Sequence, residues 1–172
     1  MIRFSRLLAF AFCFSCDIVA GAEDAPQLLR AINLNGPALV IEGREWVGKG
    51  AVHVDTGGMG GFESQNIPLR PAAEGELARM IRSSHWDGGG QNRLVVGGLP
   101  GGKVSVFLYV WEDNNPETFD VSLNGATVAT GFRSGGAGEW QRLGPWVTET
   151  RDGKIESSQR SDRENEPAAI PD

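Results

Sequence analysis

The sequence predicts an all-β protein folded as a jelly-roll β-sandwich, and three observations point to it. Glycine and proline are frequent, with 24 Gly and 9 Pro in 172 residues, so turn signals follow one another at short intervals. The clearest apolar segments alternate with a period of two, which is the period of a β-strand. Only one segment, at 74–83, has helical spacing, with Leu77, Met80 and Ile81 on one face.

Residues 1–22 are typical of an export signal. Two arginines precede the apolar run LLAFAFCFS, which is too short to span a bilayer, and the small residues at 20–22 predict cleavage after Ala22. We therefore expect an exported protein (periplasmic, cell-surface or secreted) that begins at Glu23 and does not insert into the membrane. Cleavage would also remove both cysteines of the chain. Two alternatives stay open: a buried hydrophobic N-terminal helix, and lipid attachment at Cys16.

The strongest strand signal is KVSVFLYVW at 103–111. Its even-numbered residues are aliphatic and suit a core, whereas the other face is aromatic and predicts either a second buried face or a binding platform. Residues 118–130 predict a hairpin around Asn124-Gly125, because both positions of a type I′ turn need positive φ. In that hairpin we expect Leu123 to face Ala126 and Val121 to face Val128.

We expect 103–112 and 117–131 to be adjacent antiparallel strands, whose core residues are Val106, Leu108, Phe119, Val121 and Leu123. Weaker strand patterns occupy 28–33, 38–42, 93–96 and 140–150. From residue 157 onward apolar residues are sparse, which predicts a disordered tail. The expected organisation is a signal at 1–22, one β-sandwich domain at 23–156 and a tail at 157–172.

Charge and motif content exclude several function classes. The net charge of −6 argues against nucleic acid as the main partner. The glycine-rich segment GGLPGGKV leads into a strand rather than a helix, so it does not predict a phosphate-binding loop, and we expect no cofactor. His53 and His85 lack neighbours at metal-motif spacing, so we assign no metal ligand. Calcium stays open as an alternative, because Asp, Glu and Asn oxygens suffice to bind it, although the sequence shows no calcium-loop motif. The carboxylates between 112 and 120 would make a glycoside hydrolase only if two of them faced each other across a cleft about 5–10 Å wide.

Aromatic residues beside Asp and Asn are the better indication of function. The flat face of Trp or Tyr suits the C–H face of a sugar ring, while carboxylate and amide groups bind hydroxyls. Trp86 in HWDGGG and Trp111 in WEDNN have this context, although core packing is the favoured role for each and ligand contact the alternative. The predicted ligand-binding residues are Trp86, Asp87, Tyr109, Trp111, Asp113, Asn114, Asn115 and Trp140. We expect the two loops around 86–87 and 113–115 to lie at one end of the sandwich and form a shallow sugar site.

Three segments together carry a family resemblance: RAINLNG at 30–36, LYVWE at 108–112 and FDVSLNG at 119–125. They resemble the malectin and malectin-like carbohydrate-binding family, and WEDNNPETF and GEWQRLGPW resemble its bacterial exported branch. The resemblance covers about residues 28–156. It implies a galactose-binding-like jelly roll that binds saccharides through loops at one edge and has no catalytic machinery.

The chain also departs from that family in two places. Asn114 and Asn115 stand where the family carries an aromatic pair, which puts its sugar specificity in question. The family ends with a strand that closes the sandwich, whereas this chain runs into SSQRSDRENEPAAIPD. A missing or replaced closing strand would leave an edge that could recruit a partner strand. The alternative function is therefore a structural or adhesion β-sandwich that makes protein contacts without binding sugar.

Overall fold

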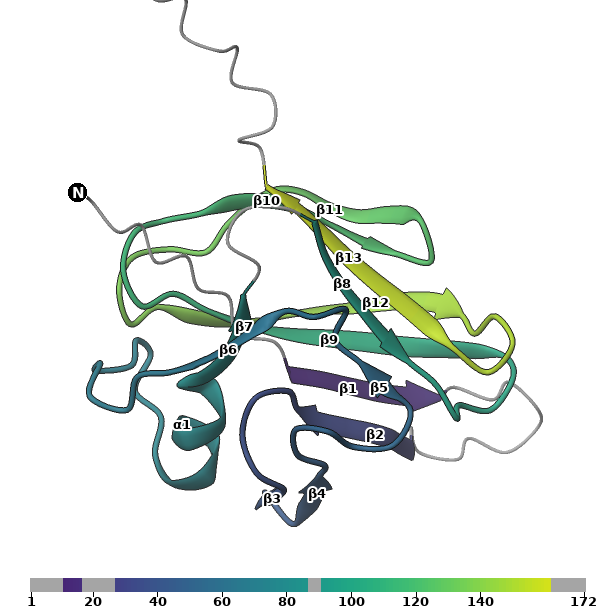
Figure 1. Ribbon diagram of the computed structural model, residues 1–172, viewed down its shortest axis with the longest axis horizontal. Coiled ribbons are helices and arrows are strands. Elements are labelled where there is room, and N and C mark those ends of the chain that lie inside the picture. The colour runs from purple at the N-terminus through teal and green to yellow at the C-terminus, as the bar shows by residue number, and fades with distance from the viewer. Residues whose placement is uncertain (1–10, 17–26, 87–90, 162–172) are drawn as a thin grey trace, which may run out of the picture.

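The chain folds into two large antiparallel sheets packed face to face, as an all-β sandwich (Figure 1). The computed structural model describes residues 11–16, as backbone, and residues 27–86 and 91–161. The four-stranded sheet has the order β12 (Trp140–Glu149), β9 (Lys103–Trp111), β1 (Ala11–Cys16), β2 (Gln27–Asn33). The five-stranded sheet has the order β11 (Ala126–Arg133), β10 (Thr118–Leu123), β13 (Ile155–Ser161), β8 (Gln91–Val96), β5 (Val54–Asp55). The predicted all-β sandwich is confirmed, and its jelly-roll topology stays a prediction.

Smaller elements lie around the four-stranded sheet. β3 (Leu39–Ile41) and β4 (Arg44–Trp46) form a hairpin, and β6 (Gly60–Glu63) pairs with β7 (Ser83–Trp86). The predicted helix is confirmed as α1 (Gly75–Ile81), which buries Met80 and Ile81. Across the described ranges, no helix has the length and apolar character needed to cross a bilayer.

The main core fills the space between the two sheets. The aliphatic face of β9 packs there against residues of β8, β10 and β13, and all five predicted core residues are buried in it. The buried members of this core are Ile32, Leu34, Leu94, Val96, Leu99, Val104, Val106, Leu108, Val110, Phe119, Val121, Leu123 and Ile155.

A second core covers the other face of the four-stranded sheet. It packs Trp111 of β9 and Ala31 of β2 against the β3–β4 hairpin, α1 and Leu69. Tyr109 and Trp140 are partly buried against the same cluster. The aromatic face of β9 is therefore a second buried face over part of its length, which explains why both faces of this strand are apolar.

The predicted pairing of 103–112 with 117–131 is wrong. β9 lies between β12 and β1, whereas β10 lies between β11 and β13 in the opposite sheet, so the chain crosses the sandwich at Glu112–Glu117. Within the hairpin, the facing pair Leu123–Ala126 is confirmed. Val121 faces Ala129 instead of Val128, because a register irregularity follows Val121.

The two large sheets include strands from beyond both ends of the predicted domain. The predicted tail is wrong for 157–161, because these residues belong to β13, an interior strand of the five-stranded sheet; residues 162–172 lie outside the described part. Within the predicted signal, residues 11–16 form β1 rather than a helix. Cleavage after Ala22 and export stay predictions, and the rest of 1–22 lies outside the described residues.

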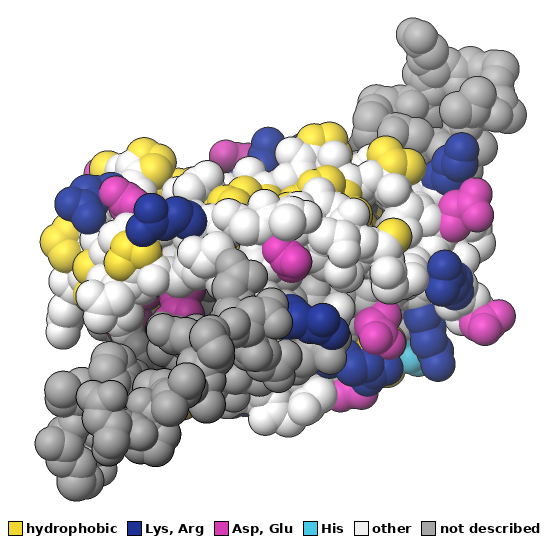
Figure 2. Space-filling view, turned by 90° about the horizontal axis from the view of Figure 1, so that it is seen from above, with side chains coloured by type: hydrophobic (Ala, Val, Ile, Leu, Met, Phe, Trp, Pro, Cys, Tyr) yellow, Lys and Arg dark blue, Asp and Glu magenta, His cyan; other side chains and the backbone are white. Residues whose placement is uncertain are grey.

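The surface carries charges of both signs. Figure 2 shows the face that is uppermost in Figure 1, where acidic and basic side chains alternate along the rim and neither sign forms a continuous patch. One such pair joins two strands of the five-stranded sheet, since Arg93 on β8 binds Glu156 on β13 at 2.8 Å. The described residues of this face therefore offer no extended surface for a polyanion.

Candidate functional site

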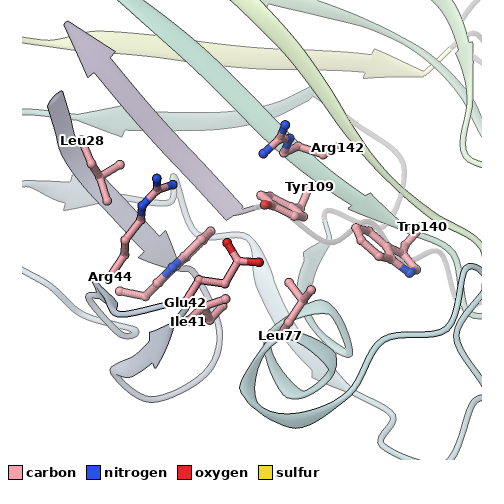
Figure 3. Close-up of a pocket in the computed structure, with 9 residues that line it drawn as sticks. Leu28, Ile41, Glu42, Arg44, Leu77, Tyr109, Trp140 and Arg142 are labelled. Carbon is pink, nitrogen blue, oxygen red and sulfur yellow. The ribbon is translucent and has the colours of Figure 1, made fainter. Parts of the chain in front are cut away.

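A pocket of about 230 Å³ lies on the outer side of the four-stranded sheet, at the edge of the second core (Figure 3). The β3–β4 hairpin supplies one wall, α1 supplies Leu77, and the sheet supplies the floor. Three of the lining residues are aromatic and three are charged. The lining residues are Leu28, Ile41, Glu42, Arg44, Trp46, Leu77, Tyr109, Trp140 and Arg142.

Aromatic rings form the floor of this pocket. The rings of Tyr109 and Trp140 are nearly parallel, with an interplanar angle of 15° and centroids 6.1 Å apart. Trp46 meets Tyr109 edge to face, with centroids 5.8 Å apart. The indole Nε1 of Trp140 donates a hydrogen bond of 2.7 Å to the carbonyl of Pro71, which fixes the ring in place. The partly exposed rings of Tyr109 and Trp140 therefore form a rigid apolar surface.

The charged groups stand on the wall and the far side of the floor. Glu42 and Gly43 form the tight β3–β4 turn, with φ values of 52° and 75°, and Figure 3 shows the Glu42 carboxylate directed toward Tyr109. Arg142 faces Tyr109 in the β9–β12 register, and its guanidinium lies 4.9 Å from the centroid of the Phe107 ring. One carboxylate and two guanidinium groups thus border the aromatic floor, and together these three groups carry a net positive charge.

Two of the eight predicted binding residues, Tyr109 and Trp140, come together in this pocket. Trp111 is fully buried in the second core, so its assignment as a ligand contact is wrong. Trp86 is partly buried and packs on the same core, but it does not line the pocket. Asp87 lies outside the described residues.

The loop at 113–115 is organised by Glu112 rather than by the pocket. The buried Glu112 carboxylate accepts hydrogen bonds of 3.1 Å from the backbone N–H groups of Asp113 and Asn114, and one of 2.7 Å from the Ser134 hydroxyl. Asn115 is exposed, and its N–H donates to Oδ1 of Asn114. None of Asp113, Asn114 and Asn115 lines the aromatic pocket, so a sugar contact at this loop stays a prediction separate from Tyr109 and Trp140.

Burial also perturbs the ionisation of this loop. Removal from water raises the pKa of Glu112 to about 7, although the Ser134 hydroxyl and the backbone N–H of Asn114 oppose the shift. Burial likewise raises the pKa of Asp113. Despite this shift, the hydrogen bonds of the Glu112 carboxyl connect Ser134 to the start of the crossover between the two sheets.

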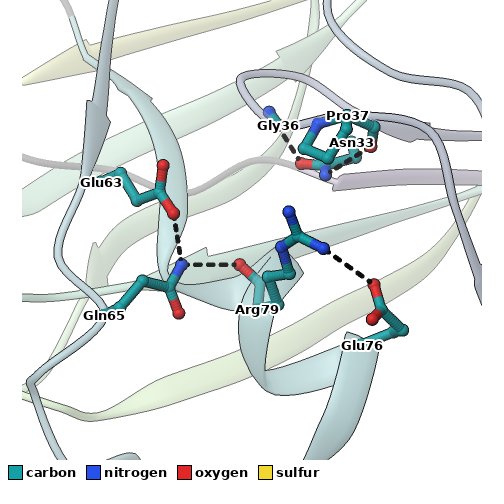
Figure 4. Close-up of polar contacts among 7 residues, drawn as sticks. All are labelled: Asn33, Gly36, Pro37, Glu63, Gln65, Glu76 and Arg79. Atoms are coloured by element: carbon teal, nitrogen blue, oxygen red, sulfur yellow. Dashed lines mark hydrogen bonds and ion pairs between the residues drawn. The ribbon is translucent and has the colours of Figure 1, made fainter.

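The other two resemblance segments also contain a polar side chain that binds backbone groups of the same chain. We call Asn33, Glu112 and Asn124 the internal braces. Figure 4 shows Asn33, which accepts a hydrogen bond from the Gly36 N–H at 3.2 Å and donates one to the Pro37 carbonyl at 3.0 Å. A Cβ at position 36 would collide with the Asn33 amide, which explains why the residue three positions after Asn33 is glycine. Asn124 likewise donates to the Glu149 carbonyl at 2.8 Å and accepts from the Glu156 N–H at 2.9 Å.

The residues that sequence reasoning missed are Glu42, Arg44, Trp46 and Arg142. The available signal was the alternation on both sides of Glu42-Gly43, where Leu39 and Ile41 precede the turn and Trp46 follows it. An apolar residue two positions after a charged one on the returning strand predicts a hairpin with one buried and one exposed face. What the sequence cannot give is that this hairpin folds over Tyr109.

The described part of the chain holds no cluster of three or more His, Cys, Asp or Glu residues placed to bind a metal ion. Comparison with known proteins adds no identification: no family model, no curated protein and no solved structure matches this chain.

Proposed function

We propose that this chain is a non-catalytic carbohydrate-binding module of an exported protein, and that the aromatic pocket holds the sugar. The observation that carries the proposal is the pair of nearly parallel rings, Tyr109 and Trp140, on the floor of a pocket with charged hydrogen-bonding groups. The resemblance of three segments to malectin-like proteins, and the jelly roll it implies, point the same way.

The physical argument is a division of labour within the pocket. The aromatic floor removes the C–H face of a sugar ring from water, while Glu42 accepts hydrogen bonds from hydroxyl groups and the guanidinium groups donate them. At about 230 Å³ the pocket lies below the usual range of ligand pockets, roughly 300 Å³ upward, so it suits a single sugar ring better than a long segment. A shallow, wet site of this size predicts a dissociation constant on the order of 10 µM to 1 mM.

The rim charges sharpen the expected ligand. The positive charges of Arg44 and Arg142 outnumber the single negative charge of Glu42. A guanidinium also binds a carboxylate with two parallel hydrogen bonds. A uronic acid is therefore expected to bind more tightly than the neutral sugar of the same stereochemistry.

The test is a glycan array of neutral and uronic-acid saccharides, followed by titration of any hit with tryptophan fluorescence as the readout. Binding that falls at least about tenfold in Arg142→Gln, and is unchanged in the loop variant Asn115→Ala, supports the pocket. The alternative function, a β-sandwich that makes protein contacts only, predicts that no saccharide binds. A hit that depends on Asn115 and is unaffected by Arg142→Gln would place the sugar at the 113–115 loop instead.

A further inference from the structure

The strand β1 occupies an interior position in the four-stranded sheet. It pairs antiparallel with β2 on one side and with β9 on the other (Figure 1). The register places residue 12 opposite Leu108, residue 14 opposite Val106 and residue 16 opposite Val104. Those three β9 residues are buried in the main core. Any strand seated between β2 and β9 therefore needs apolar residues at alternate positions, and residues 12, 14 and 16 are Phe, Phe and Cys.

The same six residues lie in the apolar run that the sequence identifies as an export signal. Export would separate the two roles, because cleavage after Ala22 removes the covalent link between this segment and the sheet before the domain folds outside the membrane. Its loss would leave β2 and β9 with facing unpaired edges about 10 Å apart, which is two strand spacings. Each edge would present a row of free N–H and C=O groups above an apolar floor, and such edges readily bind an added strand.

We propose that β2 and β9 form a strand-acceptor groove. In the full chain residues 11–16 fill this groove, and in a chain that has lost its N-terminal segment it binds an extended segment of a second polypeptide. The occupant is defined by the geometry that β1 displays. It runs antiparallel to both neighbours and carries uncharged apolar residues opposite Val104, Val106 and Leu108.

The first experiment tests the full chain and uses its two native cysteines. Cys16 faces Gln27 on β2, and Cys13 faces Phe107 on β9. Directly opposed residues in a sheet have the Cα separation that a disulfide needs. Mild oxidation should therefore link Gln27→Cys to Cys16 and Phe107→Cys to Cys13, as peptide mapping by mass spectrometry would report.

The matched control is Gln141→Cys. Gln141 is exposed on β12 and pairs with Val110 on the side of β9 away from β1, so this variant should form no intramolecular link. Equal cross-linking of all three variants, or of none, would overturn the seating of residues 11–16 between β2 and β9.

The second experiment tests whether the groove accepts a separate polypeptide. A protease site introduced at Gly21-Ala22 allows the folded full chain to be cut while β1 is still bound. A labelled peptide with the sequence of residues 10–18 should then displace the cut fragment and stay with the protein on gel filtration. The same peptide with Phe14→Pro should bind at least tenfold more weakly, because proline removes a backbone donor and disfavours an interior strand.

Two outcomes contradict the acceptor groove. A cut protein that releases its fragment, keeps its melting temperature and binds neither peptide has no groove that requires a strand. A cut protein that doubles in mass and excludes the peptide pairs with a second copy of itself, which overturns the assignment to a foreign strand.

Discussion

The internal braces and the aromatic pocket differ in what their polar groups do. Asn33, Glu112 and Asn124 direct their side chains at backbone groups of the same chain, and the first two are almost completely buried. The pocket residues Glu42, Arg44 and Arg142 border an open cavity instead. The buried polar residues of the three resemblance segments therefore serve folding, whereas the charged residues that border the pocket, Glu42, Arg44 and Arg142, lie outside those three segments.

The two groups of residues therefore determine different properties of the protein. A buried side chain that holds its own loop constrains the fold and says little about the ligand, because function depends on the site rather than on the fold. Substitutions in the braces should change stability, and substitutions in the pocket should change binding.

The largest effect is expected for Asn33→Ala. The substitution leaves the buried Gly36 N–H without its acceptor and removes a donor from the Pro37 carbonyl, so the free energy of unfolding should fall by about 3 kcal/mol. Urea denaturation measures this change. Asn115→Ala is the control, because Asn115 is exposed and should cost less than about 0.5 kcal/mol. Similar losses in both variants would show that Asn33 is not a brace.

The next effect is a pH dependence that arises from Glu112. The pKa of Glu112 is about 7 in the folded protein, above the ordinary value of 4.5 that applies to the unfolded chain. Between pH 4.5 and pH 7 the folded state therefore binds more protons than the unfolded chain. The free energy of unfolding should therefore fall by about 2 to 3 kcal/mol as the pH rises from 4.5 to 7, and then level off.

Glu112→Gln checks the source of this slope. Glutamine keeps a hydrogen-bonding group in place and does not ionise, so the variant should match the parent near pH 4 and exceed its stability at pH 8. Denaturant midpoints at several pH values provide the measurement. A variant with the parent's full slope would assign the pH dependence to other groups, such as Asp113, whose pKa is shifted in the same direction.

A smaller effect is expected for binding at the pocket. Glu42→Gln keeps the turn residue long and polar but removes its charge, so it should change the free energy of unfolding by less than about 0.5 kcal/mol. Because it removes the only carboxylate of the pocket lining, it should weaken a neutral sugar and strengthen a uronic acid, each by a few-fold. Isothermal titration with a matched pair of sugars measures both. Changes of the same sign for the two sugars would place the ligand away from this carboxylate.

The smallest effect is expected on the exposed chain of contacts beside α1. Figure 4 shows Gln65 between Glu63 and the Arg79 carbonyl, with Arg79 in turn 3.8 Å from Glu76. Both ends of the Glu76–Arg79 pair are about half exposed, so Glu76→Gln should cost no more than about 0.5 kcal/mol. A thermal melt that shows a loss as large as that of Asn33→Ala would remove the distinction between buried braces and surface pairs.

Local pattern predicted much of the fold and little of the site. Strict alternation in 103–111 and 118–123 gave the two best strands and their core faces, because one face of each must be buried. The Asn124-Gly125 turn was predictable because few residues adopt positive φ at both positions. The sheet to which each strand belongs was not predictable, since that depends on where the 112–117 crossover leads. β13 was missed because Ser157 and Gln159 are polar residues on a buried face.

The site depends on contacts between distant parts of the chain. Trp46 reaches Tyr109 only because the β3–β4 hairpin folds over the sheet, and no local pattern encodes that approach. Sequence alone also could not separate Trp111 from Trp140. The two residues pair across β9 and β12, yet one is fully buried and the other borders the pocket.

The placement of the terminal strands has a consequence for how fast this protein folds. β1 pairs with β9 across some ninety residues of chain, as in Phe12–Leu108, and β13 pairs with β8 across about sixty, as in Ile155–Val96. Loop-closure entropy opposes each of these pairings until the intervening chain has become compact. Since each sheet receives an interior strand from one end of the described chain, neither can be completed from local hairpins. Refolding should be slow for the chain length, on a timescale of milliseconds to seconds, as for other domains dominated by distant strand pairs.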